Sequence, residues 1–340
     1  MTEHSTPPNY DASAPNIDEI AIQLCPVCSS NESRPYAQGF DYEMQTCSNL
    51  WKFEQCTSCS CVWLNPRPAP STLGTIYPPS YYSYDFEKRI NPIAVKAKHI
   101  LDNGKINSII KHLAKPPESY MDVGCGSGRF LRLFDRKGMR QSRIYGLELT
   151  EKPVKQLQKE GYQAFEKRVE DFNDMPHDSI DLVTMFHVIE HVEDPGTVVR
   201  QIRNWLSPGG IFAIETPNID SIDARIFRKS WWGGYHIPRH WTLFNRKSLQ
   251  KLVEDSGLEV VHIGYQTGHS FWMYSFHHWL RYNSKYPCSQ RVANIFHPHK
   301  GVLFLASFTL FDIIRRTLGF RTSSILLIAR KPAGDPTIYF

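Results

Sequence analysis

The stretch Tyr120-Met-Asp-Val-Gly-Cys-Gly-Ser-Gly-Arg-Phe-Leu131 joins a short apolar run to a glycine-rich turn and then to a run with helical spacing of apolar residues. Gly124, Gly126 and Gly128 let the backbone bend sharply and bring its N–H groups close to a ligand at the start of a helix. A strand, turn and helix in this order predict a nucleotide-cofactor loop. A lone Gly-x-Gly is more often an ordinary turn, so the interpretation depends on what accompanies it.

The spacing of the glycines separates two kinds of cofactor. A dinucleotide-binding loop has its third glycine at position six, but the sixth residue counted from Gly124 is Arg129, which disfavours a nicotinamide enzyme. The pattern is instead Asp-x-Gly-x-Gly-x-Gly, starting at Asp122, with Glu148 at the end of the next predicted strand. This combination resembles the S-adenosylmethionine loop of the class I methyltransferases.

Further motifs extend this resemblance from about Glu118 to Val261. They are Glu170-Asp-Phe172, Asp178–Pro195 and Leu206-Ser-Pro-Gly-Gly210. The resemblance implies that Asp122 and the loop hold the methionine end of the cofactor, that Glu148 accepts hydrogen bonds from its ribose, and that Asp171 contacts its adenine. The full set of cofactor-binding residues implied in this way is Asp122, Gly124, Gly126, Gly128, Glu148, Asp171, Phe172 and His187.

Regular alternation of apolar strands and helices begins at Ser119 and predicts an α/β, doubly wound, Rossmann-like sheet with ligands at the carboxyl ends of the strands. Seven strands are expected, at residues 120–123, 143–149, 163–165, 180–186, 211–215, 258–265 and 324–330. In the family that the motifs resemble, the last strand is antiparallel to the others. A helix bent or broken near Asn103-Gly104 is expected before the first strand.

Two Cys-x-x-Cys pairs, Cys25/Cys28 and Cys56/Cys59, fit a four-thiolate zinc site because each short turn presents two sulfurs to one ion. Four protein ligands leave no open coordination position, so the zinc would be structural. Cys47 and Cys61 fall outside this spacing and are expected to be buried. The segment Cys56–Pro68 resembles the zinc-binding module that precedes many bacterial methyltransferases of sugars and polysaccharides; the catalytic part is also similar to the ubiquinone-pathway O-methyltransferase group.

The predicted organisation has four parts. They are a disordered tail at residues 1–19, a zinc-ribbon-like module at 20–70, a linker and helix at 71–117, and a methyltransferase domain at 118–333 with an aromatic insertion at about 266–322.

Candidate catalytic residues follow the fourth predicted strand. His187, Glu190 and His191 have the i, i+3, i+4 spacing that places side chains on one helical face, and a histidine can accept a proton near neutral pH. His187, His191 and His240 are the candidates for this role; the alternative is that His187 packs on the cofactor. His187/Glu190/His191 also resembles a Glu-x-x-Glu-His motif that binds a second divalent metal, although His187 replaces its first acid.

The segment Trp231–Phe244 is rich in aromatic and hydrogen-bonding side chains and is the main candidate for contact with the methyl acceptor. The residues proposed for that contact are Trp232, His236, Arg239 and His240. Arg239 would pair with a phosphate or carboxylate of the acceptor, or else form a buried ion pair that fixes the loop.

Composition bears on partners and location. The net charge of +5 is spread without long basic runs, so nucleic acid is not an expected partner. No secretion signal or membrane-spanning run is evident, and a cytoplasmic location is expected.

Two apolar stretches, Phe271–Leu280 and Val302–Leu318, are expected to be shielded from water. The alternatives are packing against the catalytic domain, against a second copy in a homodimer, or against a membrane on which the protein lies peripherally.

These observations predict an S-adenosylmethionine-dependent methyltransferase. The expected acceptor is a hydroxyl, or alternatively a carbon, of a glycan, a nucleotide-sugar or another small molecule. The rival hypothesis is a zinc-ribbon interaction module on a non-catalytic Rossmann-like scaffold.

Overall fold

The computed structural model describes residues 7–78, 92–283, 287–297 and 301–334, and the chain divides into two compact units. Unit 1 comprises Met1–Pro78, Thr216–Leu249 and Gly264–Leu326. Unit 2 comprises Pro79–Glu215, Gln250–Ile263 and Leu327–Phe340. The units therefore interleave along the chain, unlike the consecutive segments that the sequence suggested.

Most of unit 2 is built on a seven-stranded sheet of order β12-β13-β10-β9-β6-β7-β8. The pairs β6–β7, β7–β8, β6–β9 and β9–β10 are parallel. Lys331, just after β13, exchanges hydrogen bonds with Gly209 and Gly210 near the start of β10, so β13 runs antiparallel. The strands are β6 (Tyr120–Val123), β7 (Ile144–Glu148), β8 (Gln163–Glu166), β9 (Ile180–Phe186), β10 (Leu206–Pro217), β12 (Glu259–Gln266) and β13 (Ser324–Arg330). The Rossmann-like sheet and its antiparallel last strand are thus confirmed.

The order of the strands in the sheet determines where a ligand would bind. All four residues of β6 are buried, as expected of a central parallel strand covered on both faces. From β6 the chain proceeds outward through β7 and β8, and it then returns to the other side of β6 to form β9 and β10. The carboxyl ends of β6 and β9 therefore flank the point where the strand order reverses, which is where open α/β sheets bind ligands.

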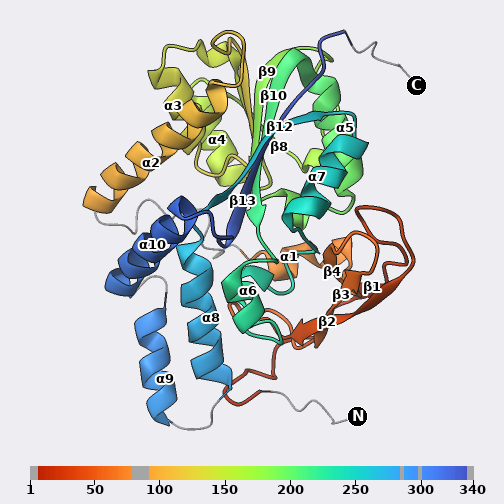
Figure 1. Cartoon of the computed structure of the whole chain (residues 1–340), viewed down its shortest axis with the longest axis vertical. Coiled ribbons are helices and arrows are strands. Elements are labelled where there is room, and N and C mark those ends of the chain that lie inside the picture. The colour runs from red at the N-terminus through yellow and green to blue at the C-terminus, as the bar shows by residue number, and fades with distance from the viewer. Residues whose placement is uncertain (1–6, 79–91, 284–286, 298–300, 335–340) are drawn as a thin grey trace. The chain divides into compact units, whose positions relative to one another are not determined.

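Helices cover the two faces of this sheet, with α3 and α4 on one side and α5 on the other in Figure 1. Phe130, Leu131, Leu133 and Phe134 form the buried side of α3, and Phe134 stacks on Tyr120 with ring centroids 3.9 Å apart. The helices are α2 (Pro92–Ile110), α3 (Arg129–Arg136), α4 (Glu151–Lys159), α5 (Pro195–Trp205) and α7 (Arg246–Asp255). Helix α2 is continuous through Asn103-Gly104, where a bend or a break was expected; an interior glycine weakens a helix by only about 1 kcal/mol.

Unit 1 contains a four-stranded sheet of order β11-β4-β3-β2 and a two-stranded sheet of β1 and β5. Its core is aromatic and includes Trp51, Phe53, Trp232, Trp241 and Trp272. These residues come from three separate stretches of the chain, which explains why the stretches fold as one unit. The strands are β1 (Glu19–Ile20), β2 (Ser33–Gly39), β3 (Trp51–Cys56), β4 (Val62–Leu64), β5 (Arg67–Pro68) and β11 (Thr242–Leu243).

The aromatic insertion forms helices of unit 1, drawn in blue in Figure 1. Helix α8 packs against α9, α10 and the 3₁₀ turn Gly233–Tyr235. The helices of unit 1 are α1 (Leu73–Ile76), α6 (Ile222–Ile226), α8 (His269–Tyr282), α9 (Pro287–Ala293) and α10 (Val302–Thr317). Among the described residues, no helix combines the length and the apolar character that crossing a bilayer requires.

The N-terminal residues differ from the expected disordered tail. Residues 1–6 lie outside the described part of the chain, but Tyr10 is buried and packs with Phe40, Tyr42 and Tyr282. Its hydroxyl donates a hydrogen bond to the carbonyl of Cys47 at 2.6 Å. Tyr10 thus anchors a segment whose composition is otherwise polar, and Ile17 adds a hydrogen bond from its N–H to Asn49.

Candidate active site and cysteine cluster

The glycine loop follows β6 and adopts the left-handed conformation that its sequence predicts. Gly124, Gly126 and Gly128 have φ values of 77°, 51° and 81°. A Cβ on Gly124 would lie 2.3 Å from a methyl carbon of Val188, and one on Gly128 would lie 2.2 Å from a methyl carbon of Leu157. A Cβ on Gly126 would meet no atom within 4 Å, so this glycine leaves open space beside the loop.

Glu148 ends β7 and is tied to this loop. Its Oε2 accepts a hydrogen bond from the Gly126 N–H at 2.8 Å, and its Oε1 accepts one from the Leu149 N–H at 2.7 Å. Burial raises the pKa of the carboxyl group, although these two N–H groups act in the opposite direction. The hydrogen bond from Gly126 therefore holds the loop against the strand-end carboxylate, although the two residues are 22 positions apart in the sequence.

Asp122 lies beneath the loop, within β6. It is buried, and its Oδ1 accepts a hydrogen bond from the Thr184 hydroxyl at 2.7 Å. Burial raises the pKa of Asp122 to about 7, while the bond from Thr184 acts to lower it. A nearby cation would favour the ionised carboxylate.

Asp171 and Phe172, predicted to contact the adenine, occupy different environments. Asp171 ends the 3₁₀ turn Val169–Asp171 and is exposed. Phe172 is fully buried, with its ring centroid 4.9 Å from that of Phe165 and 5.6 Å from that of Trp205. Its described contacts are those of a core residue.

His187 follows β9 and lies between two carboxylates. Its Nδ1 is 3.4 Å from Glu190 Oε1, and its Nε2 is 3.6 Å from Glu215 Oε1. Partial desolvation of the imidazole acts to lower the pKa of His187, but the two carboxylates outweigh it and raise the pKa to about 9. The side chain is 43% exposed, so a positively charged imidazolium reaches solvent at the carboxyl edge of the sheet.

Two residues in the group of charged side chains around His187 were not predicted from the sequence. Glu215, near the end of β10, is buried, and it forms an ion pair with Lys105 of α2 as well as with His187. These contacts lower the pKa of Glu215, against the effect of burial. An acid at the end of an apolar strand was a usable signal for Glu215, whereas nothing in the sequence of α2 marks Lys105.

Glu190 and His191 lie in the 3₁₀ turn Ile189–His191. Glu190 is fully buried and turned toward His187, and His191 is half-buried. The second divalent metal suggested for His187, Glu190 and His191 stays a prediction.

Unit 1 contains the predicted cysteine cluster. One sulfur from each of Cys25, Cys28, Cys56 and Cys59 lies within 4.8 Å of the others. Both the Cys25–Cys59 and the Cys28–Cys56 sulfur distances are 3.5 Å. A tetrahedral site with Zn–S bonds of about 2.3 Å places its sulfurs about 3.8 Å apart, so the donor set fits one four-coordinate ion.

Two other cysteines of this unit are buried, as expected. Cys47 and Cys61 are fully buried and do not belong to the cluster of four.

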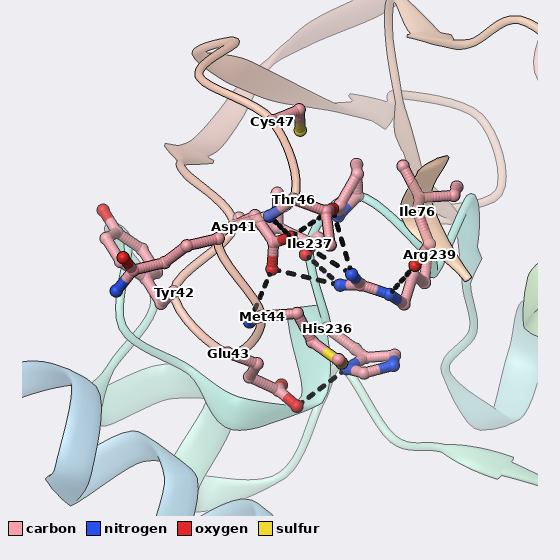
Figure 2. Close-up of polar contacts among 12 residues, drawn as sticks. Asp41, Tyr42, Glu43, Met44, Thr46, Cys47, Ile76, His236, Ile237 and Arg239 are labelled. Carbon is pink, nitrogen blue, oxygen red and sulfur yellow. Dashed lines mark hydrogen bonds and ion pairs between the residues drawn. The ribbon is translucent and has the colours of Figure 1, made fainter. Parts of the chain in front are cut away.

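Arg239, a candidate for acceptor binding, is fully buried in unit 1 and its described contacts are internal (Figure 2). Its guanidinium donates to Asp41 Oδ1 at 3.0 Å and Oδ2 at 3.1 Å, to the Thr46 hydroxyl at 3.2 Å, and to the carbonyl of Ile76 at 2.7 Å. Burial acts to raise the pKa of Asp41, but Arg239 outweighs it and holds the pKa below its usual value. The geometry matches the alternative of a buried ion pair that fixes the loop.

The other acceptor candidates are also buried in unit 1. Trp232 donates its indole N–H to Asp223 Oδ2 at 2.7 Å, and His240 donates Nδ1–H to the carbonyl of Gly234 at 2.8 Å. His236 Nδ1 lies 2.9 Å from Glu43 Oε2, and Figure 2 shows these two side chains directed toward each other. Trp232, His236, Arg239 and His240 thus all belong to unit 1, whereas the residues predicted to bind the cofactor all belong to unit 2.

Comparison with known protein families supports the predicted cofactor site in unit 2. A sequence model of the family described as "Methyltransferase domain" matches residues 98–263. The match contains the glycine loop, Glu148 and the His187 cluster. An intact loop and strand-end acid disfavour the hypothesis of a non-catalytic scaffold.

Curated relatives share shorter regions. An uncharacterised 37.1 kDa protein in transposon TN4556 of Streptomyces fradiae is 31% identical over 113 residues, which cover 32% of this chain and 33% of that protein. The ubiquinone biosynthesis O-methyltransferase of Marinobacter nauticus is 27% identical over 131 residues, covering 36% of this chain and 54% of that enzyme. The chain therefore spans between a third and about half of the length of these relatives.

Among solved structures, a SAM dependent methyltransferase from Archaeoglobus fulgidus aligns with a TM-score of 0.45 and 17% identity. The alignment covers 74% of this chain and 99% of that one.

Proposed function

We propose that this protein, whose residues 98–263 form a methyltransferase domain of the class I S-adenosylmethionine-dependent family, transfers a methyl group to a hydroxyl of a glycan, a nucleotide-sugar or another small-molecule acceptor. The observation that carries the proposal is the hydrogen bond between the Gly126 N–H and Glu148. It joins the left-handed glycine loop to the strand-end acid at the switch point of the sheet, which is where such a cofactor binds.

S-adenosylmethionine supplies a methyl group on a positively charged sulfur. In this proposal the carboxylate of Glu148 accepts hydrogen bonds from the two ribose hydroxyls, and Asp171 contacts the adenine amino group. Asp122 and the loop at Gly124–Gly128 hold the methionine end, where a carboxylate favours the cationic groups. The chain's main task is to hold donor and acceptor in line, because methyl transfer is a single displacement.

His187 is proposed to accept the proton of the acceptor hydroxyl. Because Glu190 and Glu215 raise its pKa to about 9, the neutral form that accepts a proton is a minority at pH 7. The rate of methyl transfer to a hydroxyl should therefore rise with pH toward about 9, and His187→Gln should remove this rise. Transfer to a carbon that needs no such base would show no comparable dependence.

Hydroxyl acceptors are favoured over carbon by the relatives named as O-methyltransferases. The glycan or nucleotide-sugar class rests on the resemblance of the Cys56–Pro68 segment to modules of sugar methyltransferases. The test is to measure demethylated cofactor formed with nucleotide-sugars, lipid-linked glycans and phenols. Turnover with phenols alone would overturn the sugar class, and a preparation that binds cofactor but turns over none of the three sets would contradict the proposed acceptors.

The four cysteines are proposed to hold one structural zinc ion, since their sulfur distances fit a tetrahedral thiolate site. The ion would join the turn at Cys25–Cys28 to the end of β3, and its binding energy would contribute to the folding of unit 1. Strong chelators should lower the melting temperature, and Cys28→Ser should lose stoichiometric zinc. Cys288→Ser is the control, because Cys288 is exposed and lies outside the cluster. Full zinc content in Cys28→Ser would contradict the assignment.

A second divalent ion beside His187, Glu190 and His191 is a separate proposal. It predicts that turnover by zinc-loaded protein needs added Mg²⁺ or Mn²⁺. Unchanged turnover after removal of such weakly bound ions would contradict it.

A further inference from the structure

The outer face of α10 exposes a stripe of apolar side chains, with the polar Ser307 among them. Leu303, Leu310, Ile314 and Leu318 are 77%, 59%, 49% and 67% exposed, and Phe304 and Phe311 are exposed beside them. At about 100° per residue, these six side chains fall within a sector of about 120° of the helix. Apolar residues in such a sector normally face a core, but here the leucine and isoleucine side chains are largely exposed, while Phe304 and Phe311 also make ring contacts with Phe296 and Trp272.

Contacts on the opposite face fix the rotation of α10. Phe308 stacks on Trp272 with ring centroids 5.7 Å apart. The fully buried Asp312 accepts hydrogen bonds from the Gly268 N–H at 2.8 Å and from Arg315 at 3.1 Å. Turning the stripe inward would break this buried network, so its exposure is built into the fold of unit 1.

The segment that contains α10 is strongly basic. Between Gln266 and Thr322 there are seven Lys and Arg residues and a single acidic residue, Asp312, which gives this segment a net charge of +6 against +5 for the whole chain. Since Asp312 is buried and paired, the exposed surface of the described part of the segment has basic side chains and no acidic one. Lys285 and Lys300 of the seven lie outside the described residues; the others are Arg281, Arg291, Arg315, Arg316 and Arg321. Of these, Arg315 is paired with Asp312 and Arg321 forms an ion pair with Asp220, outside the segment.

We propose that the outer face of α10 lies on the surface of an anionic lipid bilayer. With 16 residues, α10 is about 24 Å long, too short for the roughly 30 Å hydrocarbon core, so it would lie in the plane of the interface. Apolar side chains on one face with basic residues around it are the pattern of interfacial helices. A symmetric dimer through the same face would bring two segments of net charge +6 together, which disfavours a second copy as the occupant.

Three cations flank the apolar residues of α10 in the sequence: Lys300, Arg315 and Arg316. Arg316 is exposed at the end of α10, and Lys300 lies outside the described residues. Arg315 is buried and donates to the carbonyl of Arg321 at 2.5 Å, so it holds the helix in place and does not meet a bilayer.

Flotation of the full-length protein with phosphatidylcholine vesicles containing phosphatidylglycerol tests the proposal. The wild-type protein should float at low salt, and it should float less with pure phosphatidylcholine or at high salt, because the charge attraction is screened. The double variant L310E/I314E should reduce the partition coefficient at least about ten-fold. Ile226→Glu, which changes an equally exposed residue on α6, should leave it unchanged.

Ser307→Leu replaces the polar residue within the stripe and should raise the partition coefficient, which keeps the test valid if the double variant misfolds. Wild-type protein that stays soluble with anionic vesicles would overturn the proposal. So would equal flotation of L310E/I314E and the wild type. A wild-type dimer that this variant converts to a monomer, without vesicle binding, would identify the occupant as a second copy. None of these outcomes depends on methyl transfer.

Discussion

At the residue scale, His187 shows how the fold sets a protonation state. Its pKa in the folded protein is about 9, above the value of about 6.5 expected in the unfolded chain, so its protonation stabilises the folded state. This contribution is fully present below pH 6.5 and is lost as the pH rises through about 9. The melting temperature of His187→Gln should therefore fall below that of the wild type at pH 6, and the gap should narrow by pH 10.

Thermal unfolding across this pH range checks the prediction. His177, an exposed histidine elsewhere in unit 2, provides the control variant His177→Gln, for which we expect a small difference in melting temperature. A gap for His187→Gln that stays constant from pH 6 to pH 10 would show that Glu190 and Glu215 do not hold the imidazolium.

Arg239 distinguishes a structural role from acceptor recognition. Removing one partner of a fully buried ion pair leaves the other charge uncompensated, so Arg239→Met should cost about 3–5 kcal/mol of folding free energy. The double variant D41N/R239M should recover part of that loss. Arg225→Met, at an exposed pair with Asp220, should cost less than about 1 kcal/mol.

Denaturant titration of the four proteins measures these differences. If Arg239→Met unfolded like the wild type while the KM for the acceptor rose, Arg239 would belong to the acceptor site. The sequence left both roles open because the partner, Asp41, is 198 residues away, and no local pattern connects the two.

At the element scale, the strands were predictable because each is a local apolar run. Those of the sheet in unit 2 appear within a few residues of their expected positions; β10 is longer than expected and begins at Leu206. The glycine loop was predictable for the same reason, since the left-handed conformation is a property of Gly124, Gly126 and Gly128 themselves. The contacts of Lys105 with Glu215 were not, because they depend on where α2 lies against the finished sheet.

The open space beside Gly126 gives a prediction for the loop. Alanine at Gly126 meets no atom but must keep φ near 51°, at a cost of about 1–2 kcal/mol. In the proposed binding mode, its methyl group occupies space that the cofactor needs. Gly126→Ala should therefore bind S-adenosylhomocysteine at least about ten-fold more weakly while remaining folded.

Gly138 provides the matched control. It also has a positive φ, 90°, with no atom within 4 Å of an added Cβ, but it lies after α3 and away from the loop. Gly138→Ala should lose similar stability and keep normal affinity. Equal affinity of the two variants for S-adenosylhomocysteine would mean that the loop does not approach the cofactor as proposed.

At the scale of the whole molecule, the unexpected feature is the interleaving of the two units. The sequence suggested a separate zinc module before the catalytic domain, whereas β4 of the cysteine-containing segment pairs with β11 more than 170 residues later. The insertion also joins this unit, through Trp272 in its aromatic core. Such long-range associations depend on complementary surfaces in three dimensions, and periodicity along the chain does not reveal them.

The central claim is that the glycine loop and Glu148 bind S-adenosylmethionine, and calorimetric titration with S-adenosylhomocysteine tests it most directly. Folded, zinc-loaded protein should bind one molecule per chain. Glu148→Gln should weaken binding at least about ten-fold, because charge-assisted hydrogen bonds to the ribose are lost. Glu166→Gln, at the register partner of Glu148 on β8, should bind like the wild type. Absence of binding by the wild type, or equal affinity of Glu148→Gln and the wild type, would contradict the claim.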